Sequence, residues 1–208
     1  MSPTPSFRRP APLYPSVADA IPGAPDPAQT ADLAHQSAEA LLHGVFHSAD
    51  EDVVQRVLTL VEREGLGDLA TLWSAAPATS LPGALWRLYV LHTWVQRQTE
   101  EVTLRYREGS RTVPGLRYLA GLEEPPSLEQ TRSAMDLILR GAFTGDLSVA
   151  LARAGAVAVI AAHGTAHLAD SESTEAAQRE LTVQAERLLT TGEELAAAGH
   201  AARHGTLD

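Results

Sequence analysis

Histidines are the residues of this chain whose spacing could do chemistry. The chain has eight histidines, and six of them form pairs separated by four residues: His43/His47, His163/His167 and His200/His204. Residues i and i+4 lie on the same face of an α-helix, so each pair could share one metal ion. His35 and Glu39 continue the same spacing before His43. A Zn²⁺ or Ni²⁺ ion could take two ligands from such a stripe and a third from a neighbouring helix.

Other observations favour a structural role for these histidines. No glutamate follows a histidine in H-E-x-x-H order, so the general base of the zincin metalloproteases is missing. Gly44 and Gly164 lie between paired histidines and weaken the helices that must position them. Histidine also favours the C-terminal end of a helix through the macrodipole. We therefore interpret the histidines as solvated or capping residues, and keep a metal site as the alternative, with these candidate ligands: Glu39, His43, His47, His163 and His167.

Sequence signatures of catalysis and cofactor binding are missing from the chain. It contains no G-x-x-x-x-G-K-[ST] loop, no G-x-G-x-x-G after a strand and no G-x-S-x-G elbow. There is no cysteine to act as a nucleophile or thiolate ligand, and there is no lysine to form a Schiff base. We therefore assign no catalytic residue and favour a non-catalytic protein over an enzyme.

The charge of the chain bounds its partners and its location. The formal net charge is −10, which opposes binding to nucleic acid or to an anionic membrane surface. The longest apolar stretch, Ala154 to Ala162, is far shorter than the roughly 20 residues that span a bilayer. Residues 1–10 lack the apolar core of a secretory signal. We expect a cytoplasmic protein that binds neither nucleic acid nor membranes.

The apolar pattern predicts an all-α fold. From about residue 27 onward apolar residues recur at helical spacing, and no window alternates long enough to predict a β-strand. The most apolar helix, about Leu81–Gln98, carries large apolar side chains over most of its circumference, and Ser80 is placed to cap it. We therefore predict a single-domain bundle of seven or eight helices around this buried central helix.

Composition divides the chain into four segments. Residues 1–26 are rich in proline and are expected to form an extended or disordered arm. The helical core domain is expected over residues 27–164. A C-terminal amphipathic helix follows over residues 170–199, and residues 200–208 are expected to be a flexible tail.

Turn and capping signals refine these boundaries. Ser48 and Glu51 form a capping box for a second helix. Prolines and glycines predict a loop over residues 110–126 and, with polar residues, a break from Gly164 to Ser173. In the last helix, apolar residues recur in steps of four and three: Leu181, Ala185, Leu188 and Leu195. That seam could pack back on the bundle or pair with a second copy of the chain.

Two parts of the chain are Leu72–Ala76 with Ser80–Tyr89, and Arg140–Leu147 with Val149–Ala154. Both resemble a family of small helical actinobacterial proteins, and the likeness extends from about Arg9 to Gly164. The resemblance implies a bacterial cytoplasmic origin and gives no mechanism. Some members are labelled RNA polymerase β subunit or thymidine phosphorylase. This chain lacks the length and strand content of the first, and the lysines and Gly-rich loops of the second.

Two functional hypotheses follow. The first is a non-catalytic helical protein, acidic on its surface, that binds or regulates another protein or pairs with itself as a homodimer through the C-terminal helix. The second is a metal-binding protein or metal-dependent enzyme that uses the H-x-x-x-H histidines.

Overall fold

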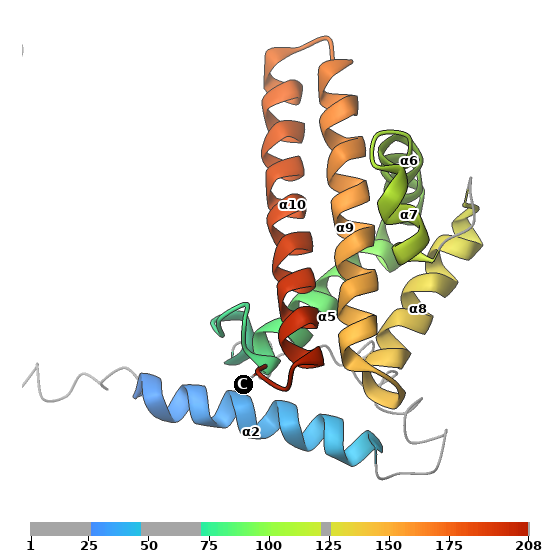
Figure 1. Cartoon of the computed structure of the whole chain (residues 1–208). Helices are drawn as coiled ribbons and strands as arrows, with labels where there is room; N and C mark the ends of the chain where they lie inside the picture. The colour runs from blue at the N-terminus through green and yellow to red at the C-terminus, as the bar shows by residue number, and fades with distance from the viewer. Residues whose placement is uncertain (1–25, 47–71, 122–125, 208) are drawn as a thin grey trace, which may run out of the picture.

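The computed structural model of the chain describes residues 26–46, 72–121 and 126–207. Within these ranges the chain forms helices and no strand, which confirms the predicted all-α, single-domain bundle (Figure 1). The helices are α2 (Pro27–Phe46), α5 (Leu81–Arg97), α6 (Thr99–Ser110), α7 (Pro114–Ala120), α8 (Leu128–Thr144), α9 (Leu147–Asp170) and α10 (Glu175–Arg203).

Two of the sequence predictions fall outside the described residues. They are the helix that Ser48 and Glu51 were expected to cap and, apart from Asp26, the Pro-rich arm over residues 1–26.

Helix α9 runs through the middle of the bundle. It lies between α10 on one side and α6 and α7 on the other, and it also contacts α5 and α8 (Figure 1). Of its 24 residues, 14 are buried. Although Ala154 to Ala162 is short, the whole helix is long and apolar enough to span a bilayer by length and composition. Its burial against five neighbouring helices is that of a core helix in a globular bundle.

Helix α5 is the predicted central helix, and it contacts α2, α6, α8, α9 and α10. The Oγ of Ser80 accepts a hydrogen bond from the Gly83 backbone N–H at 3.3 Å, which confirms the predicted cap. Eight of the 17 residues of α5 are buried. Trp86 and Trp94 are only half-buried and Val90 is 44% exposed. One face of α5 therefore enters the core, whereas α9 is buried more completely.

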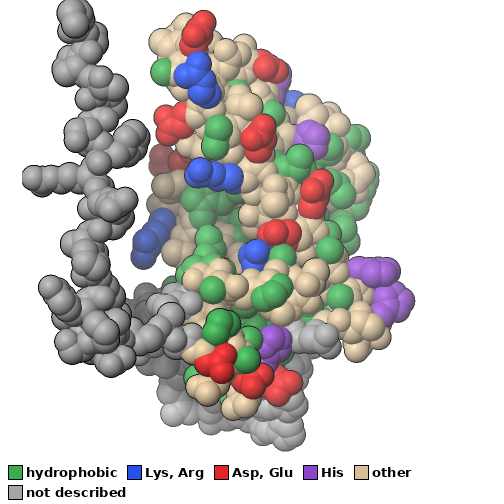
Figure 2. All heavy atoms as spheres, turned by 90° about the vertical axis from the view of Figure 1, so that its left-hand side faces the viewer, with side chains coloured by type: hydrophobic (Ala, Val, Ile, Leu, Met, Phe, Trp, Pro, Cys, Tyr) green, Lys and Arg blue, Asp and Glu red, His purple; other side chains and the backbone are tan. Residues whose placement is uncertain are grey.

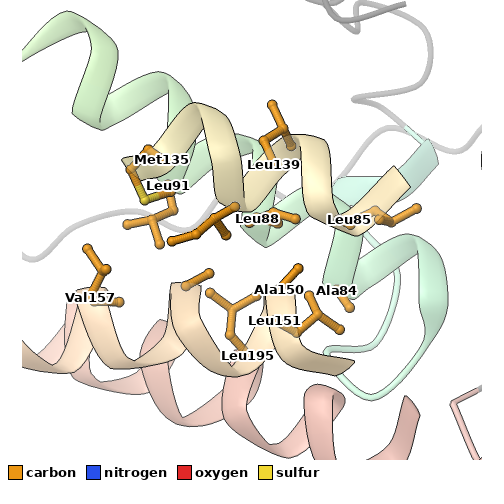
Figure 3. Close-up of a cluster of buried hydrophobic side chains, with 14 of the residues drawn as sticks. Ala84, Leu85, Leu88, Leu91, Met135, Leu139, Ala150, Leu151, Val157 and Leu195 are labelled. Atoms are coloured by element: carbon orange, nitrogen blue, oxygen red, sulfur yellow. The ribbon is translucent and has the colours of Figure 1, made fainter. Parts of the chain in front are cut away.

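The main core lies where α5, α8, α9 and α10 meet. Figure 3 shows apolar side chains from these four helices pointing toward one another, among them Leu88, Met135, Leu151 and Leu195. Each of these four side chains is at most 1% exposed. Burial of one such side chain stabilises a fold by roughly 1.5–3 kcal/mol, so this cluster holds the four helices together.

Helices α6 and α9 cross with their backbones in contact. A Cβ atom at Gly164 would lie 1.7 Å from the Arg105 carbonyl oxygen, and one at Gly109 would lie 1.8 Å from the Ile160 carbonyl oxygen. Only glycine fits at both positions. The polar break predicted from Gly164 to Ser173 is therefore wrong over most of its length, because α9 continues to Asp170 and uses Gly164 for this crossing.

Helices α9 and α10 form a tightly packed antiparallel pair. A Cβ atom at Gly192 would lie 2.9 Å from the Gly155 carbonyl oxygen, and one at Gly199 would lie 2.9 Å from the Ser148 carbonyl oxygen. Leu195 of the predicted apolar seam is fully buried in the core. The seam thus packs back on the bundle, and α10 belongs to the same domain as residues 27–164.

Two further boundaries differ from the sequence predictions. The predicted loop over residues 110–126 contains α7, which begins at Pro114 and ends at Gly121 in the left-handed conformation. Proline at the first helical position and glycine just past the end are helix signals as much as loop signals. The predicted flexible tail over residues 200–208 begins inside α10, which continues to Arg203.

The α6–α9 crossing predicts opposite effects for two glycine substitutions. Gly164→Ala should lower the free energy of unfolding by about 3 kcal/mol or more, because the new methyl group collides with backbone rather than with a mobile side chain. Gly141→Ala is the matched control, since nothing lies within 4 Å of its added Cβ in the interior of α8. It should raise stability by roughly 0.5–1 kcal/mol. Urea unfolding followed by circular dichroism measures both, and equal effects would contradict the crossing.

The N-terminal cap of α9 predicts a dependence of stability on pH. Hydrogen bonds from the Ser148 side chain and from the Val149 and Ser148 backbone N–H groups, helped by the charge of Arg203, lower the pKa of Asp146 below 3.8. The ionised carboxylate should therefore stabilise the fold fully above the unfolded-state pKa of about 4, and lose that effect as the pH falls through the lower folded-state pKa. The stability advantage of the wild type over Asp146→Asn should be constant near neutrality and shrink below pH 4 or so. An advantage that grows on acidification would contradict this assignment.

Candidate interaction surface

An apolar groove runs between α9 and α10. It is lined by one turn of α9 and two turns of α10, and its volume is about 200 Å³. Its lining consists of Ala162, His163, Ala166, Thr182, Ala185, Glu186 and Leu189. The exposed surface inside it is almost entirely apolar, although the groove is open to solvent.

The helical repeat explains why this groove is open. Leu188 and Leu195 lie on the side of α10 that faces the core, where α5 contacts both α9 and α10. Leu189 is one residue further along and is turned by about 100° toward the groove, where it is 36% exposed. One side of the α9–α10 pair is therefore covered by α5, and the groove lies on a side that keeps apolar atoms in contact with solvent.

The groove has the form of a hole for one side chain of another helix. Ala162 and Ala166 are one turn apart on α9, and Ala185 and Leu189 are one turn apart on α10. These two pairs, one on each helix, border an apolar hole that could receive one side chain of a third helix. His163 and Glu186 stand at the rim and supply polar groups beside the apolar floor.

Two larger pockets differ in character from this groove. One, of about 550 Å³, lies where the start of α9 meets the end of α10, and Asp146 and Leu207 are among its lining residues. The other, of about 530 Å³, lies at the junction of α5 and α6 beside α8. Its walls carry charges of both signs: Arg97, Glu100, Glu101, Glu129 and Arg132. Neither presents the continuous apolar floor of the α9–α10 groove.

The predicted metal ligands of α9 point to different neighbours. His163 borders the groove, whereas the Nε2 of His167 lies 3.9 Å from an Oε2 of Glu108 on α6. Both histidines are exposed. Among the described residues, no three His, Cys, Asp or Glu side chains come together so as to hold a metal ion.

The predicted ligands near the N-terminus lie on α2. Glu39 is exposed there, and the Nδ1 of His35 is 2.9 Å from the Ala31 carbonyl oxygen, one turn back along the helix. The structure describes the backbone of His43 but not its side chain, and His47 lies outside the described residues. The stripe formed by these four residues therefore stays a prediction.

A series of polar contacts joins α8 to α5 and α6, and the sequence did not reveal it. The Arg107 guanidinium donates to the Pro126 carbonyl oxygen at 2.6 Å, and Thr103 donates to Thr131 at 3.0 Å. Further along, Arg132 Nε donates to the Thr99 hydroxyl at 2.8 Å. From one contact to the next, the residue numbers fall along α6 and rise from Pro126 into α8. The contacts therefore fix the antiparallel register of α8.

His92 completes this series at the α5 end. Its ring is 2% exposed, and its Nε2 lies 2.7 Å from an Oδ1 of Asp136. The Gln96 side chain donates to the same Oδ1 at 2.7 Å. A lone histidine in a run of apolar residues gives no sequence signal for such a role, because the partner carboxylate is 44 residues away.

Arg105 is the second buried charged residue that the sequence did not single out. Its guanidinium is bonded to Glu101 and donates to Gln184 Oε1 of α10 at 2.8 Å. It also lies 5.6 Å from the ring centre of Trp94, within the range of a cation–π interaction. Arg105 is only 5% exposed and joins α5, α6 and α10.

Comparisons with known proteins find no relative of this chain. No protein-family profile, no curated protein and no solved structure matches the chain.

The α8 contacts predict the cost of removing one acceptor. Asp136→Ala should lower stability by about 1–3 kcal/mol, because the buried His92 ring loses its carboxylate partner. Ser133→Ala is the control on the exposed side of the same helix, and it should change stability by about 0.5 kcal/mol or less. Guanidinium unfolding curves of both variants and the wild type provide the measurement. If both substitutions were neutral, the His92–Asp136 contact would contribute nothing to the fold.

Proposed function

We propose that this protein is a non-catalytic, cytoplasmic binding protein that docks an amphipathic helix of another protein in the α9–α10 groove. The observation that carries the proposal is the apolar hole formed by Ala162, Ala166, Ala185 and Leu189 on a surface exposed to solvent. A large apolar side chain of the partner would fill this hole.

The packing of the chain itself supports a helix as the occupant. The side of the α9–α10 pair that faces the core is already covered by a helix, α5, which contacts both α9 and α10. Alanine in the open groove permits the close approach that a second helix needs, as the glycines do where α9 meets α10. Helix-in-groove recognition uses apolar anchors at positions i, i+3, i+4 and i+7 of the bound helix.

Charge favours a partner with basic residues beside its apolar stripe. Glu186 stands at the rim of the groove, and the chain carries a formal net charge of −10. Such a field attracts positively charged partners and slows the approach of acidic ones. In Figure 2, charged side chains of both signs are scattered among apolar ones on the visible face. The groove would therefore supply the apolar contact, and the net negative charge of the chain would favour partners with basic residues.

Substitution of Ala185 tests the groove directly. Helical peptides selected from a display library on the full-length wild-type protein should bind Ala185→Arg at least about tenfold more weakly, because the new side chain fills the hole. Ala197→Arg is the control for the added charge, since Ala197 is exposed on the same helix and does not line the groove, and circular dichroism checks that Ala185→Arg, at a position only 7% exposed, is folded. The control adds the same charge and should leave binding unchanged. Fluorescence polarisation of labelled peptides gives the affinities.

Two results would overturn the proposal. Peptides whose binding is weakened equally by both arginine variants would be responding to charge and not to the groove. A wild-type dimer in light scattering that Ala185→Arg dissociates and Ala197→Arg does not would show that the groove binds a second copy of the chain.

A further inference from the structure

The C-terminal end of α10 is closed by a well-formed cap. Gly205 adopts a left-handed conformation with φ of 66°. Its backbone N–H donates to the Ala202 carbonyl at 3.2 Å, and the Thr206 N–H donates to the Ala201 carbonyl at 3.0 Å. These two bonds define a Schellman motif. Leu207 then packs against the core, which holds the last turn of the helix in place.

This cap fixes two histidines beside each other. His200 lies in the last turn of α10 and His204 is its C-cap residue, so the two are one turn apart. Their ring centres are 4.5 Å apart with an angle of 61° between the planes. Both side chains are exposed, so their ring nitrogens are accessible to solvent.

The electrostatic surroundings of this pair favour a cation. The C-terminal end of a helix carries a partial negative charge, because the dipoles of its peptide groups are aligned. Imidazole nitrogens one turn apart are the donors that Cu²⁺, Ni²⁺ and Zn²⁺ prefer.

We propose that His200 and His204 chelate one divalent transition-metal ion at the C-terminal end of α10, with water in the remaining coordination positions. The site is independent of the α9–α10 groove. It also differs from the ligand sets that the sequence favoured, which centre on α2 and on His163 and His167.

The contacts of the other described pair explain why it is not chosen. His163 and His167 have the same four-residue spacing, but His167 is near Glu108 while His163 borders the groove. The ring centres of His200 and His204 are 4.5 Å apart, so the two side chains already lie side by side on one face of the helix end.

Titration with Cu²⁺ alone tests the site. The full-length protein without an affinity tag should bind one equivalent of Cu²⁺ in isothermal calorimetry, with nitrogen hyperfine structure in its electron paramagnetic resonance spectrum. His200→Gln and His204→Gln should each weaken this binding by about tenfold to a hundredfold, because chelation by two linked donors is lost. A rise in melting temperature on addition of Cu²⁺ should occur in the wild type and disappear in both variants.

Two double variants serve as controls, because each removes another pair of histidines with the same four-residue spacing. His163→Gln/His167→Gln and His43→Gln/His47→Gln should both keep the bound equivalent and its spectrum. The proposal is overturned if the wild type binds no Cu²⁺, if His200→Gln binds as tightly as the wild type, or if the equivalent disappears in either double variant. Circular dichroism confirms that each variant is folded.

Discussion

The backbone contact between α6 and α9 is the constraint on which the rest of the bundle depends. Gly109 and Gly164 let the two helices approach until each backbone touches the other. This crossing sets the angle of the α5–α6 segment, because only Gln98 separates α5 from α6. Helix α7 follows α6 closely and is thereby placed against α9. The polar contacts that fix the register of α8 can form only once α5 and α6 are in place.

The sequence predicts the elements of this fold better than their arrangement. Ser80 identifies the start of α5 correctly, because a capping interaction is local and leaves its trace within four residues. Gly164 misleads for the opposite reason. A glycine chosen for contact with a helix 55 or so residues earlier looks the same in the sequence as a glycine that ends a helix. Single-residue signals therefore carry local information and hide contacts between distant segments.

The candidate site shows the same division. The spacing of Leu188 and Leu195 predicts an apolar seam on the last helix. Whether that seam packs on the bundle or on a second copy of the chain depends on where α5 lies, which the spacing does not predict. His163 was singled out by its spacing to another histidine, and the structure places it at the rim of a groove. The alanines that form that groove have no sequence signal of their own, because alanine recurs along the whole of α9 and α10.

The groove and the tight α9–α10 contact are two results of the same composition. Where a small residue faces another backbone, as Gly155 faces Gly192, the space closes and the helices lock together. Where a small residue faces solvent, as the exposed Ala166 does beside the buried Ala162, the space stays open as a hole. A hole of about 200 Å³ admits essentially one large side chain, so one anchor residue would supply most of the binding energy. The proposed docking of a helix would therefore depend chiefly on the side chain that enters this hole.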